Sequence, residues 1–435
     1  MTHPPDRDEH LPRPDEPPRS AGGVDAFATV GLEGSWLRST FASLRLRNFR
    51  LFYIGQGTSL VGTWVRRTAL GWLVYELTGS RALLGAVMGL SLLPLFVLSP
   101  AAGAIADRVD RRRMIIAAQV LASLTSAAIA ALVLSGQVQT WHLMALATLG
   151  GVAFAVEAPA RQAFVVEMVG REHLLNAIAL NSALVNLSRI IGPGVAGLLM
   201  GTIGIGFCFL VDAVSYLAVI ATLVAMRLQP RTILPRRTSH WQELLEGFRE
   251  VRRNRPVRIL LLLLFVMGVF GWSFQTLMPA IAQDLLHLSE LQYGVLMSMF
   301  GVGAIVGALI VAARTTSGTS RLQVFGGLWT LCAGSLIVSM SRAMLPMSAG
   351  IMVAGFGAVM FLSTSNTLVQ TSVDDGIRGR VMGIWAVGFG GSLPLGSFLA
   401  GWVAELISPY LTIALFATVL AAASFIIWAR LPHRE

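Results

Sequence analysis

The feature that most constrains this chain is a series of about twelve apolar runs, each close to 20 residues long. A helical run of this length matches the hydrocarbon core of a bilayer, where backbone polar groups are satisfied only in helices or closed barrels. Hydrophobic residues make up 54% of the 435 residues and charged residues 13%, against about 25% charged residues in soluble domains. The sequence therefore excludes a water-soluble globular protein and predicts an all-α polytopic membrane protein.

The runs group into two halves of six expected helices, residues 46–227 and residues 257–430. VVEMVGREHLLNA and QTSVDDGIRGRVMG, at the ends of the fourth and tenth runs, stand about 200 residues apart, and Pro193 and Pro394 repeat at nearly the same interval. This weak repetition favours an internal duplication, as in transporters built from repeated halves. The expected spans are about 50–76, 82–106, 114–135, 140–160, 176–202, 205–227, 257–283, 291–313, 322–341, 344–373, 380–404 and 409–429.

Three segments lie outside the expected spans. Residues 1–45 are polar and proline-rich and lack the apolar core of a signal peptide, so we expect a disordered cytoplasmic tail. Residues 228–256 join the halves, and apolar side chains recur there at helical spacing beside arginines, which predicts an amphipathic helix on the inner leaflet. These positions are Trp241, Leu244, Leu245, Phe248, Arg249, Arg252 and Arg253. Residues 431–435 form a short cytoplasmic tail.

All 33 basic residues are arginine, and they gather in alternate loops. Because basic loops remain on the cytoplasmic side, this pattern predicts a multi-pass protein of the cell (inner) membrane with both termini in the cytoplasm. It also accounts for the net charge of +10 without a nucleic-acid partner. The absence of lysine excludes a P-loop ATPase and Schiff-base chemistry. Cys208 and Cys332 lie far apart in apolar runs, and the seven histidines lack ligand spacing, so no disulfide, metal or cofactor is expected.

A charged loop between the second and third spans has the sequence GAIADRVDRRR, which begins at Gly103. This glycine permits close helix approach, and Asp107 stands where a helix enters the interface. Arg108, Arg111 and Arg112 offer charge-assisted hydrogen bonds. A loop that only anchors the protein needs the arginines but not the glycine and the aspartate at fixed spacing, so we interpret the segment as a gate.

The first expected span carries a polar face. At 100 degrees per residue, its members are Gln56, Ser59, Thr63 and Arg67, with Arg66 at the edge. A charge facing lipid costs about 2.5 to 3.5 kcal/mol. The face is therefore expected to line a watery cavity or to meet a partner. The alternative is that the two long arginine side chains reach the outer membrane surface.

The fifth expected span repeats the pattern, and its polar face includes Asn186 and, near the middle of the membrane, Arg189. A guanidinium at this depth needs an acidic or polar partner. Glu157 in the fourth span and Asp212 in the sixth are the strong acidic candidates well inside the first half. Such a pair is either a structural salt bridge or a titrating pair coupled to transport, and the sequence leaves both open.

Two further patterns concern helix packing and the lining of a cavity. On the fifth span, Gly192, Pro193 and Gly197 combine a missing helix hydrogen bond with close packing, which predicts a kink. The second half offers Ser363, Asn366, Thr367 and Gln370 on one face of the tenth span, and Trp272, Phe274 and Gln275 in the seventh. These side chains fit either contacts with a bulky organic substrate or polar packing between helices.

Several of these segments resemble a known transporter superfamily. The loop at Gly103 is similar to the motif of the major facilitator superfamily, which has Gly, three residues, Asp, Arg, one residue, usually Gly, and two basic residues; here Asp110 replaces that Gly. FRLFYIGQGTSLVGTWVRRTALGWLVYELTGS, EAPARQAFVVEMVGREHLLNAIALNSALVNLSRIIGPGVAG and IRGRVMG look like the bacterial branch that includes the enterobactin exporter and drug-efflux proteins. SRIIGPGVAG also partly resembles the Gly-Pro motif of superfamily antiporters.

The resemblance implies the major facilitator fold, with twelve transmembrane helices around a central cavity and alternating access. It implies a secondary active transporter, a proton-driven exporter of a siderophore or an amphiphilic drug-like molecule. Asp107 and Arg111 would then latch the halves in the outward-facing state. An uptake carrier of the same fold and a membrane receptor remain alternatives, whereas no convergent catalytic set indicates an enzyme. The expected partners are a small-molecule substrate, protons and membrane lipids, and the expected functional unit is a monomer.

Candidate roles follow from this interpretation. We expect Arg189 and Arg67 to shape the cavity and attract anionic groups, and Glu157 or Asp212 to carry the proton. The gate candidates are Gly103, Asp107, Arg108, Arg111 and Arg112, and the helix-kink candidates are Gly192, Pro193 and Gly197. The cavity candidates are Gln56, Thr63, Arg66, Arg67, Asn186, Gln275, Asn366 and Gln370.

Overall fold

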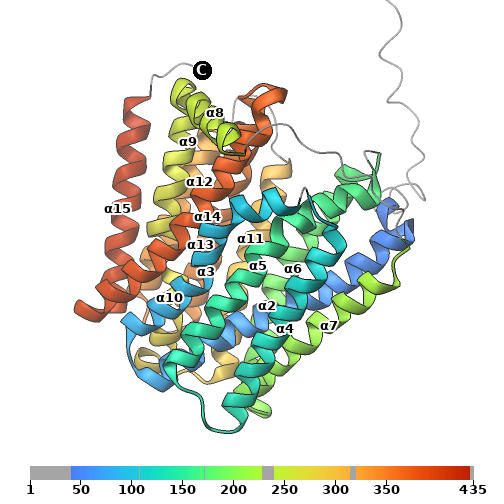
Figure 1. The fold of residues 1–435 in the computed structure, drawn as a ribbon. Helices are drawn as coiled ribbons and strands as arrows, with labels where there is room; N and C mark the ends of the chain where they lie inside the picture. The colour runs from blue at the N-terminus through green and yellow to red at the C-terminus, as the bar shows by residue number, and fades with distance from the viewer. Residues whose placement is uncertain (1–40, 107, 171, 228–239, 314–319, 432–435) are drawn as a thin grey trace, which may run out of the picture. The chain divides into compact units, whose positions relative to one another are not determined.

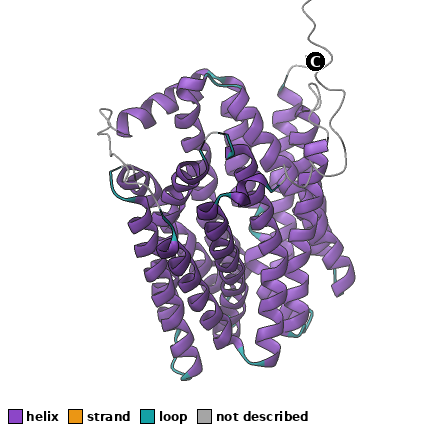
Figure 2. Ribbon diagram, turned by 90° about the vertical axis from the view of Figure 1, so that its right-hand side faces the viewer, coloured by secondary structure: helices purple, strands orange, loops and turns teal. Residues whose placement is uncertain are grey.

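The computed structural model describes residues 41–106, 108–170, 172–227, 240–313 and 320–431. Every regular element in these residues is a helix, and no strand occurs among them (Figure 2). The expected all-α class is therefore confirmed. Parts of several expectations lie outside the described residues: the tail up to residue 40, Asp107, the linker over 228–239 and the end of the chain over 432–435.

The first half has a short 3-10 helix followed by six long helices. They are η2 (Ala42–Arg45), α2 (Arg47–Thr78), α3 (Arg81–Ala106), α4 (Arg111–Leu134), α5 (Thr140–Val169), α6 (Leu174–Thr202) and α7 (Ile205–Ala225). The linker contains α8 (His240–Arg253). The second half has α9 (Arg255–Val266), η3 (Met267–Gly271), α10 (Phe274–Ala280), η4 (Ile281–Leu285), α11 (Glu290–Ala313), α12 (Ser320–Met340), α13 (Met344–Thr371), α14 (Asp375–Leu406) and α15 (Pro409–Arg430).

Eleven segments are long and apolar enough to cross a membrane, counted over the described part of the chain. One of them is Arg255–Leu285, in which η3 and η4 are π-helical turns between and after α-helical pieces. The remaining long helix, α2, has 32 residues and carries the polar face, which lowers its mean hydropathy. Its Gly55 and Gly62 lie against α7, so α2 belongs to the bundle and completes the twelve expected spans.

Element boundaries differ from the expected ones at three places. Ser43 donates a hydrogen bond to Asn176 at 2.7 Å, so the chain is attached to the first half before the expected end of the tail. Helix α5 continues through Pro159 to Val169, because a proline removes one hydrogen bond that neighbouring helices can replace. Helix α14 begins at Asp375, where an acidic side chain interacts favourably with the positive end of the helix dipole.

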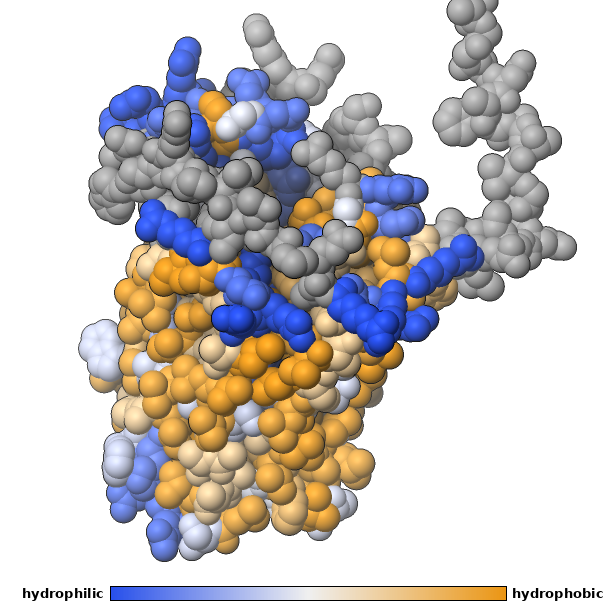
Figure 3. Space-filling view, turned by 45° about the vertical axis from the view of Figure 1, so that its right-hand side comes forward, coloured by the Kyte–Doolittle hydropathy of each residue, from blue (hydrophilic) through white to orange (hydrophobic). Residues whose placement is uncertain are grey.

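The bundle has two chemically different ends. We call the end at which α2 stops and α3 starts the arginine-poor end, and the end at which α3 stops and α4 starts the arginine-rich end. Figure 3 shows an apolar belt over the middle of the molecule, with a strongly hydrophilic surface at one end and a smaller hydrophilic patch at the other. A belt of this kind is the surface that the hydrocarbon core of a bilayer requires.

The two halves touch mainly through two pairs of helices, α3 with α14 and α6 with α11 (Figure 1). A Cβ added to Gly401 on α14 would lie only 2.7 Å from the Cα of Gly85 on α3. A Cβ added to Gly197 on α6 would lie 3.0 Å from the Cα of Gly294 on α11. We call these two contacts the glycine crossings. Both lie near the arginine-poor end, where backbone rests directly on backbone.

Helices α3 and α14 separate toward the arginine-rich end. On α14, Gly391 and Gly390 still lie against Phe96 and Leu95 of α3. A Cβ added to Gly388, or to any of the three glycines nearer the start of α14, would meet nothing within 4 Å. The contact between the halves therefore ends partway along the bundle, and the halves meet at the arginine-poor end.

Helix α8 packs on the second half. Gly247 lies against Ile384 and Arg380 of α14, and Glu246 forms an ion pair with Arg380. Phe248 is 53% exposed. The position of this helix on a membrane leaflet stays a prediction, but its contacts with α14 mean that α8 and the second half form one packed unit.

Candidate functional site

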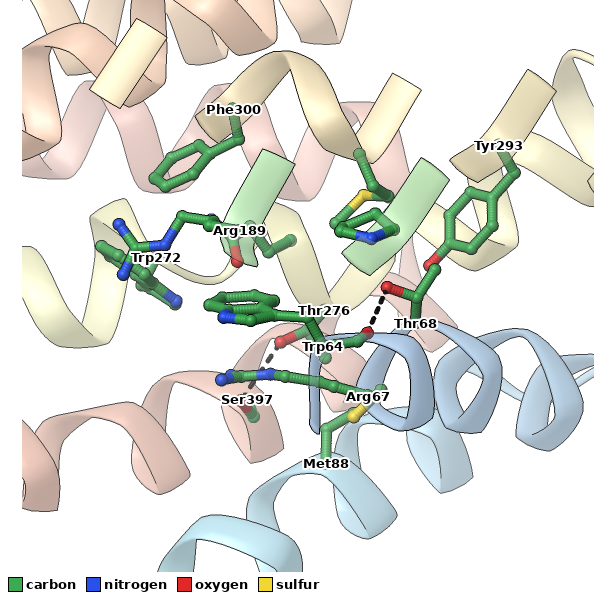
Figure 4. Close-up of a pocket in the computed structure, with 13 residues that line it drawn as sticks. Trp64, Arg67, Thr68, Met88, Arg189, Trp272, Thr276, Tyr293, Phe300 and Ser397 are labelled. Atoms are coloured by element: carbon green, nitrogen blue, oxygen red, sulfur yellow. Dashed lines mark hydrogen bonds between the residues drawn. The ribbon is translucent and has the colours of Figure 1, made fainter. Parts of the chain in front are cut away.

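A cavity lies between the two halves beside the glycine crossings (Figure 4). We call it the central cavity. Helices α2, α3 and α6 of the first half form one wall, and α10, α11 and α14 form the other. The residues that matter below are Trp64, Arg67, Met88, Arg189, Trp272, Gln275, Tyr293 and Phe300. Because both halves supply the lining, any relative movement of the halves changes the shape of this cavity.

Two arginines stack on aromatic rings in the central cavity. The Arg189 guanidinium carbon lies 5.3 Å from the centre of the Trp64 ring and 5.8 Å from the centre of the Phe300 ring. The Arg67 guanidinium carbon lies 5.5 Å from the Trp64 ring, and Figure 4 shows Trp64 between the two arginine side chains. Cation–π contacts stabilise such groups by about 0.5 to 2 kcal/mol. They hold two positive charges in the cavity without neutralising them.

The expected pairing of Arg189 with Glu157 or Asp212 is wrong. Both carboxylates pair with other arginines, and no described carboxylate forms an ion pair with Arg189 or Arg67. The reason lies in helix packing, because α6 directs Arg189 toward α11 and Trp64, whereas Asp212 on α7 faces α2 and α4. Arg67 reaches the central cavity and not the membrane surface.

Arg66 and Asp212 form an ion pair inside the first half, with Nε 3.0 Å from Oδ2. Asp212 is fully buried, and the Ser126 hydroxyl donates to the same oxygen at 2.5 Å. The other carboxylate oxygen, Oδ1, has no hydrogen-bond partner among the described residues. The hydroxyls of Thr63 and Tyr216 lie 3.3 Å apart. The alternative in which Arg66 reaches the membrane surface is therefore wrong, and its guanidinium belongs to a buried polar cluster.

Glu157 pairs with Arg161, one turn further along α5, with Arg161 Nε 3.1 Å from Glu157 Oε1. The two side chains are 11% and 15% exposed, so the pair is largely shielded from solvent. The spacing of four residues is a sequence signal that could have identified Arg161. Ser126 and Tyr216 carry no such signal, since their contacts depend on how α4 and α7 dock against α2.

A second space adjoins the central cavity, and we call it the polar compartment. It is lined by first-half residues, and it shares Arg67 and Met88 with the central cavity. Its free volume is about 120 Å³, against about 40 Å³ for the central cavity. Its polar lining consists of Gln56, Ser59, Thr63, Arg66, Arg67, Ser91, Glu157, Arg161 and Tyr216. The polar face predicted for the first span thus lines a cavity.

The predicted cavity residues divide into two groups. Gln56, Thr63, Arg66 and Arg67 line the polar compartment, and Gln275 lines the central cavity. Asn186, Asn366 and Gln370 line neither space. The Asn186 amide donates to the Ser182 carbonyl at 2.9 Å, and the Gln370 amide donates to the Asn366 side chain at 2.6 Å. The cavity role of these three residues stays a prediction.

The Gly-Pro segment of α6 makes close contacts on both sides. Gly192 lies against Trp64 of α2, Pro193 lines the central cavity, and Gly197 forms a glycine crossing with α11. Helix α6 is continuous from its first to its last residue. The expected close packing is present, and the kink stays a prediction.

The charged loop binds within its own half. Asp110, which departs from the superfamily motif, caps α4 by accepting from the backbone N–H of Arg112 at 2.9 Å. Arg111 donates to the side chain of Glu167 on α5 at 3.4 Å, and Arg112 donates to the Val224 carbonyl on the last turn of α7 at 2.9 Å. In this conformation these arginines bind carboxylate and carbonyl groups of the first half.

Two other gate candidates are not in close contact with a helix. Gly103 was expected at a close helix contact, but a Cβ added there would meet nothing within 4 Å. Arg108 is exposed. Both observations follow from the separation of α3 and α14 toward this end. The gate role of the loop therefore remains a prediction about another conformation, in which α3 and α14 meet here.

A polar cluster that the sequence analysis missed joins the halves at the arginine-poor end. Glu405 accepts hydrogen bonds from the backbone N–H groups of Arg81 at 2.7 Å and Ala82 at 3.1 Å, so α14 of the second half caps α3 of the first. Asp284 lies 3.5 Å from the Arg81 guanidinium and accepts a hydrogen bond from Tyr75. We call these five residues the Arg81 cluster. No sequence signal identifies it, because its partners meet only when the halves dock.

Known proteins match this chain over most of its length. Residues 38–435 match a family described as transmembrane secretion effectors. The staphyloferrin A transporter of Staphylococcus aureus (strain NCTC 8325 / PS 47) is 26% identical over 361 residues, which cover 82% of this chain and 89% of that protein. The enterobactin exporter EntS of Escherichia coli O1:K1 / APEC is 26% identical over 388 residues, which cover 86% of this chain and 89% of that protein. The crystal structure of the nucleoside transporter NupG has a TM-score of 0.68 at 16% identity, with 90% of this chain and 100% of that chain covered, which shows a shared fold.

Proposed function

The chain belongs to the transmembrane secretion effector family of the major facilitator superfamily, and we propose on this premise that it is a proton-driven exporter of a siderophore or another amphiphilic organic molecule. It is a multi-pass membrane transporter, as its relatives are. The proposal adds direction, driving ion and substrate class. It assigns export by alternating access, in which the halves rock around the central cavity.

The central cavity is the observation that carries the proposal. Both halves line it, and it contains the aromatic faces of Trp64, Trp272 and Phe300 beside the guanidinium groups of Arg67 and Arg189. A site of this composition suits a molecule that combines apolar surface with polar or anionic groups.

Orientation supports export. Positively charged loops remain in the cytoplasm, so the arginine-rich end and both termini are assigned to the cytoplasmic side of the cell membrane. The halves meet at the arginine-poor end and separate toward the arginine-rich end. In this conformation the cavity accordingly receives its substrate from the cytoplasm, and closing of the opposite end directs the substrate outward.

Asp212 is the proposed proton carrier. It is fully buried, one of its oxygens has no partner among the described residues, and its partner Arg66 also lines the polar compartment. A proton bound to Asp212 removes the negative charge that holds Arg66, and release of the proton restores the pair. This changes the charge of the cavity wall during transport. Glu157, paired with Arg161, is the alternative carrier.

Asp107 and Arg111 are assigned to the cytoplasmic gate. In the structure Arg111 contacts α5 of its own half. The proposal is that these residues hold the arginine-rich end together after the cavity has turned outward. A monomer is the proposed functional unit, because the cavity and both pairs of crossing helices belong to one chain.

The test is transport into inverted membrane vesicles with an acidic lumen, screened with dyes, antibiotics and catecholate siderophores while a lumenal dye reports pH. We expect substrate uptake into the lumen, coupled to proton release from it. Asp212→Asn should reduce this coupled transport at least about tenfold, because the neutral amide cannot exchange a proton. Glu172→Gln is the matched control, since Glu172 is an exposed carboxylate in a loop.

Loss of folding has to be separated from loss of coupling. Removing one member of a buried ion pair costs about 3 to 5 kcal/mol, so Asp212→Asn is compared with the double variant Arg66→Gln/Asp212→Asn, which leaves no unpaired charge. Monodisperse protein with downhill transport but no proton release supports the carrier role. Full coupled transport in both Asp212→Asn and Glu157→Gln contradicts proton coupling through these residues, and substrate movement only in the opposite direction contradicts export.

A further inference from the structure

Two differently lined spaces meet at Arg67 and Met88. The central cavity is lined by the aromatic rings of Trp272, Phe300 and Tyr293, and by Trp64, whose ring lies between Arg67 and Arg189 (Figure 4). In this conformation the polar compartment has a volume of about 120 Å³ and the central cavity about 40 Å³, so the central cavity has to widen, by movement of the two halves that line it, before an aromatic body fits there. A ligand that occupies both spaces must therefore differ chemically between its two ends.

The lining of the polar compartment has an excess of positive charge. Arg66, Arg67 and Arg161 contribute three guanidinium groups, and Glu157 contributes one carboxylate. Glu157 pairs with Arg161, and Asp212 pairs with Arg66 from behind the lining. This leaves Arg67, which lines both spaces, without a carboxylate among the described residues; Arg189 of the central cavity also lacks one there, but its guanidinium stacks on the Trp64 and Phe300 rings. An anionic group that enters the compartment supplies the missing partner.

Buried hydrogen-bonding groups nearby also lack partners. The Gln56 side chain lines the polar compartment, is 3% exposed, and its Oε1 accepts no hydrogen bond within the described part of the chain. The Gln275 amide nitrogen, in the central cavity, likewise has no hydrogen-bond partner among the described residues. Buried polar groups are nearly always paired, so unpaired ones facing a cavity mark where a ligand or water binds.

We infer that the substrate has two parts: a flat aromatic body that stacks in the central cavity, and a short anionic arm that enters the polar compartment and binds Arg67. This inference rests on the proposed export function and specifies its substrate class. The body contacts both halves, whereas the arm contacts the first half alone. Residues of the first half therefore determine the selectivity for the charge of the arm. Residues of both halves determine the selectivity for the shape of the body.

One substitution can fill the polar compartment without straining the backbone. Gly150 on α5 lines the compartment, and a Cβ added there would lie 3.8 Å from Arg66 Nη1 and 3.7 Å from Thr125 Oγ1, which is ordinary contact. Gly150→Leu therefore occupies the space for the arm beside Arg66. Gly326→Leu is the matched control, because Gly326 lies on α12, lines neither space and would bring its Cβ only to 3.5 Å from the flexible end of Met360.

The probes are 1-pyrenebutyrate and 1-pyrenebutanol, which share an aromatic body and differ in the charge of a short arm. Binding to purified detergent-solubilised protein is measured by energy transfer from tryptophan to pyrene. We expect the unsubstituted protein to bind the butyrate about tenfold more tightly than the butanol, the effect of one charge-assisted hydrogen bond. Gly150→Leu should reduce this preference to about twofold or less, and Gly326→Leu should leave it unchanged.

Two further variants separate arm from body. Gln56→Leu removes an amide oxygen that has no partner among the described residues. It is expected to lower the affinity for each probe less than twofold and to reduce the preference for the butyrate over the butanol. Trp272→Ala is expected to weaken both probes equally, because it removes an aromatic face that lines the central cavity and whose described ring contacts are with Phe300 and Phe389, not with Arg67.

The possible results separate the two-part substrate from the export function on which it rests. Equal binding of the two probes by the unsubstituted protein overturns the anionic arm. Equal weakening of both probes by Gly150→Leu overturns the assignment of the polar compartment to the arm. Unchanged probe binding by Gly150→Leu together with lost proton release in vesicles also overturns it and makes the compartment a proton path. Failure of folded protein to bind either probe contradicts the proposed function of the central cavity itself.

Discussion

The two ends of the bundle use different chemistry where the halves face each other. At the arginine-poor end, backbone meets backbone at the glycine crossings, and the Arg81 cluster adds hydrogen bonds from one half to the other. At the arginine-rich end, Arg112 donates to the Val224 carbonyl and Arg321 to the Trp428 carbonyl, each within its own half. Contacts between the halves are therefore found at one end, while these two arginines at the other end each bind within a single half. This difference indicates that close backbone packing, together with the hydrogen bonds of the Arg81 cluster, holds the arginine-poor end closed. At the arginine-rich end, these contacts between the halves are missing from the described residues.

The largest effect is expected from Gly197→Leu. The side chain has to occupy space taken by the backbone of α11, with the Glu290 carbonyl oxygen 2.7 Å from the added Cβ, so the crossing cannot close. Overpacking costs about 1 to 3 kcal/mol, and an unyielding backbone neighbour places this site at the upper end, roughly a hundredfold change in population. Spin labels at Gln137→Cys and His287→Cys, in a Cys208→Ala/Cys332→Ala background, should report a longer distance across the arginine-poor end.

Gly201→Leu is the control for this experiment. Gly201 lies one turn further along the same helix, and a Cβ added there would meet nothing within 4 Å. The label distance and the transport rate should match those of the parent protein. An equal lengthening in both variants would show that helix α6 itself, and not the crossing, responds to the leucine.

A smaller effect is expected from Glu405→Ala. The substitution removes the acceptor that α14 supplies to the first N–H groups of α3, and loss of a helix cap costs about 1 kcal/mol. This corresponds to a roughly fivefold shift toward the form in which the arginine-poor end is open. Glu405→Gln retains an acceptor oxygen and should recover most of the shift, as measured with the same pair of labels. No shift in either variant would remove the Arg81 cluster from the closed interface.

The smallest effect, of opposite sign, is expected from Arg111→Ala. In the structure this side chain binds Glu167 and the Ala163 carbonyl of α5, whereas the proposed gate uses it when the arginine-rich end closes. Its loss should favour the present conformation by about 0.2 to 1 kcal/mol. Labels at Glu172→Cys and Ser372→Cys should report a larger population with the arginine-rich end open. Arg113→Ala, at a side chain 88% exposed, is the control and should not change the distribution.

The fold could be predicted from sequence because the membrane leaves few choices for long apolar runs. Runs that end at arginines or turn residues became helices with nearly the expected limits, and Gly79, at a positive φ of 59°, ends α2 as a glycine cap. The expected end of the fourth span was too early, because Pro159 and the charged residues Glu157 and Arg161 are residue types common at the membrane–water boundary, where a span ends. Inside the bundle, that pair neutralises its own charge and the helix continues.

The site was predicted only in part, because sequence gives the depth of a residue along a helix but not the neighbour it meets. Depth was sufficient to identify Arg67, Arg189 and Asp212 as buried charges that need a role. It could not show that Asp212 faces Arg66, or that Trp64 stands between two guanidinium groups. Those contacts are set by the rotation of α2 and α7 and by the docking of the halves, and neither leaves a periodic signal in one chain.

The two glycine crossings have a consequence for the geometry of motion. Two rigid bodies that share two fixed points can turn only about the line through them, so they retain a single degree of freedom. As long as both crossings stay in contact, the opening between the halves is described by one angle. All distances measured between the halves at the arginine-rich end should then change together. Two distances that change independently of each other would show that one half bends internally.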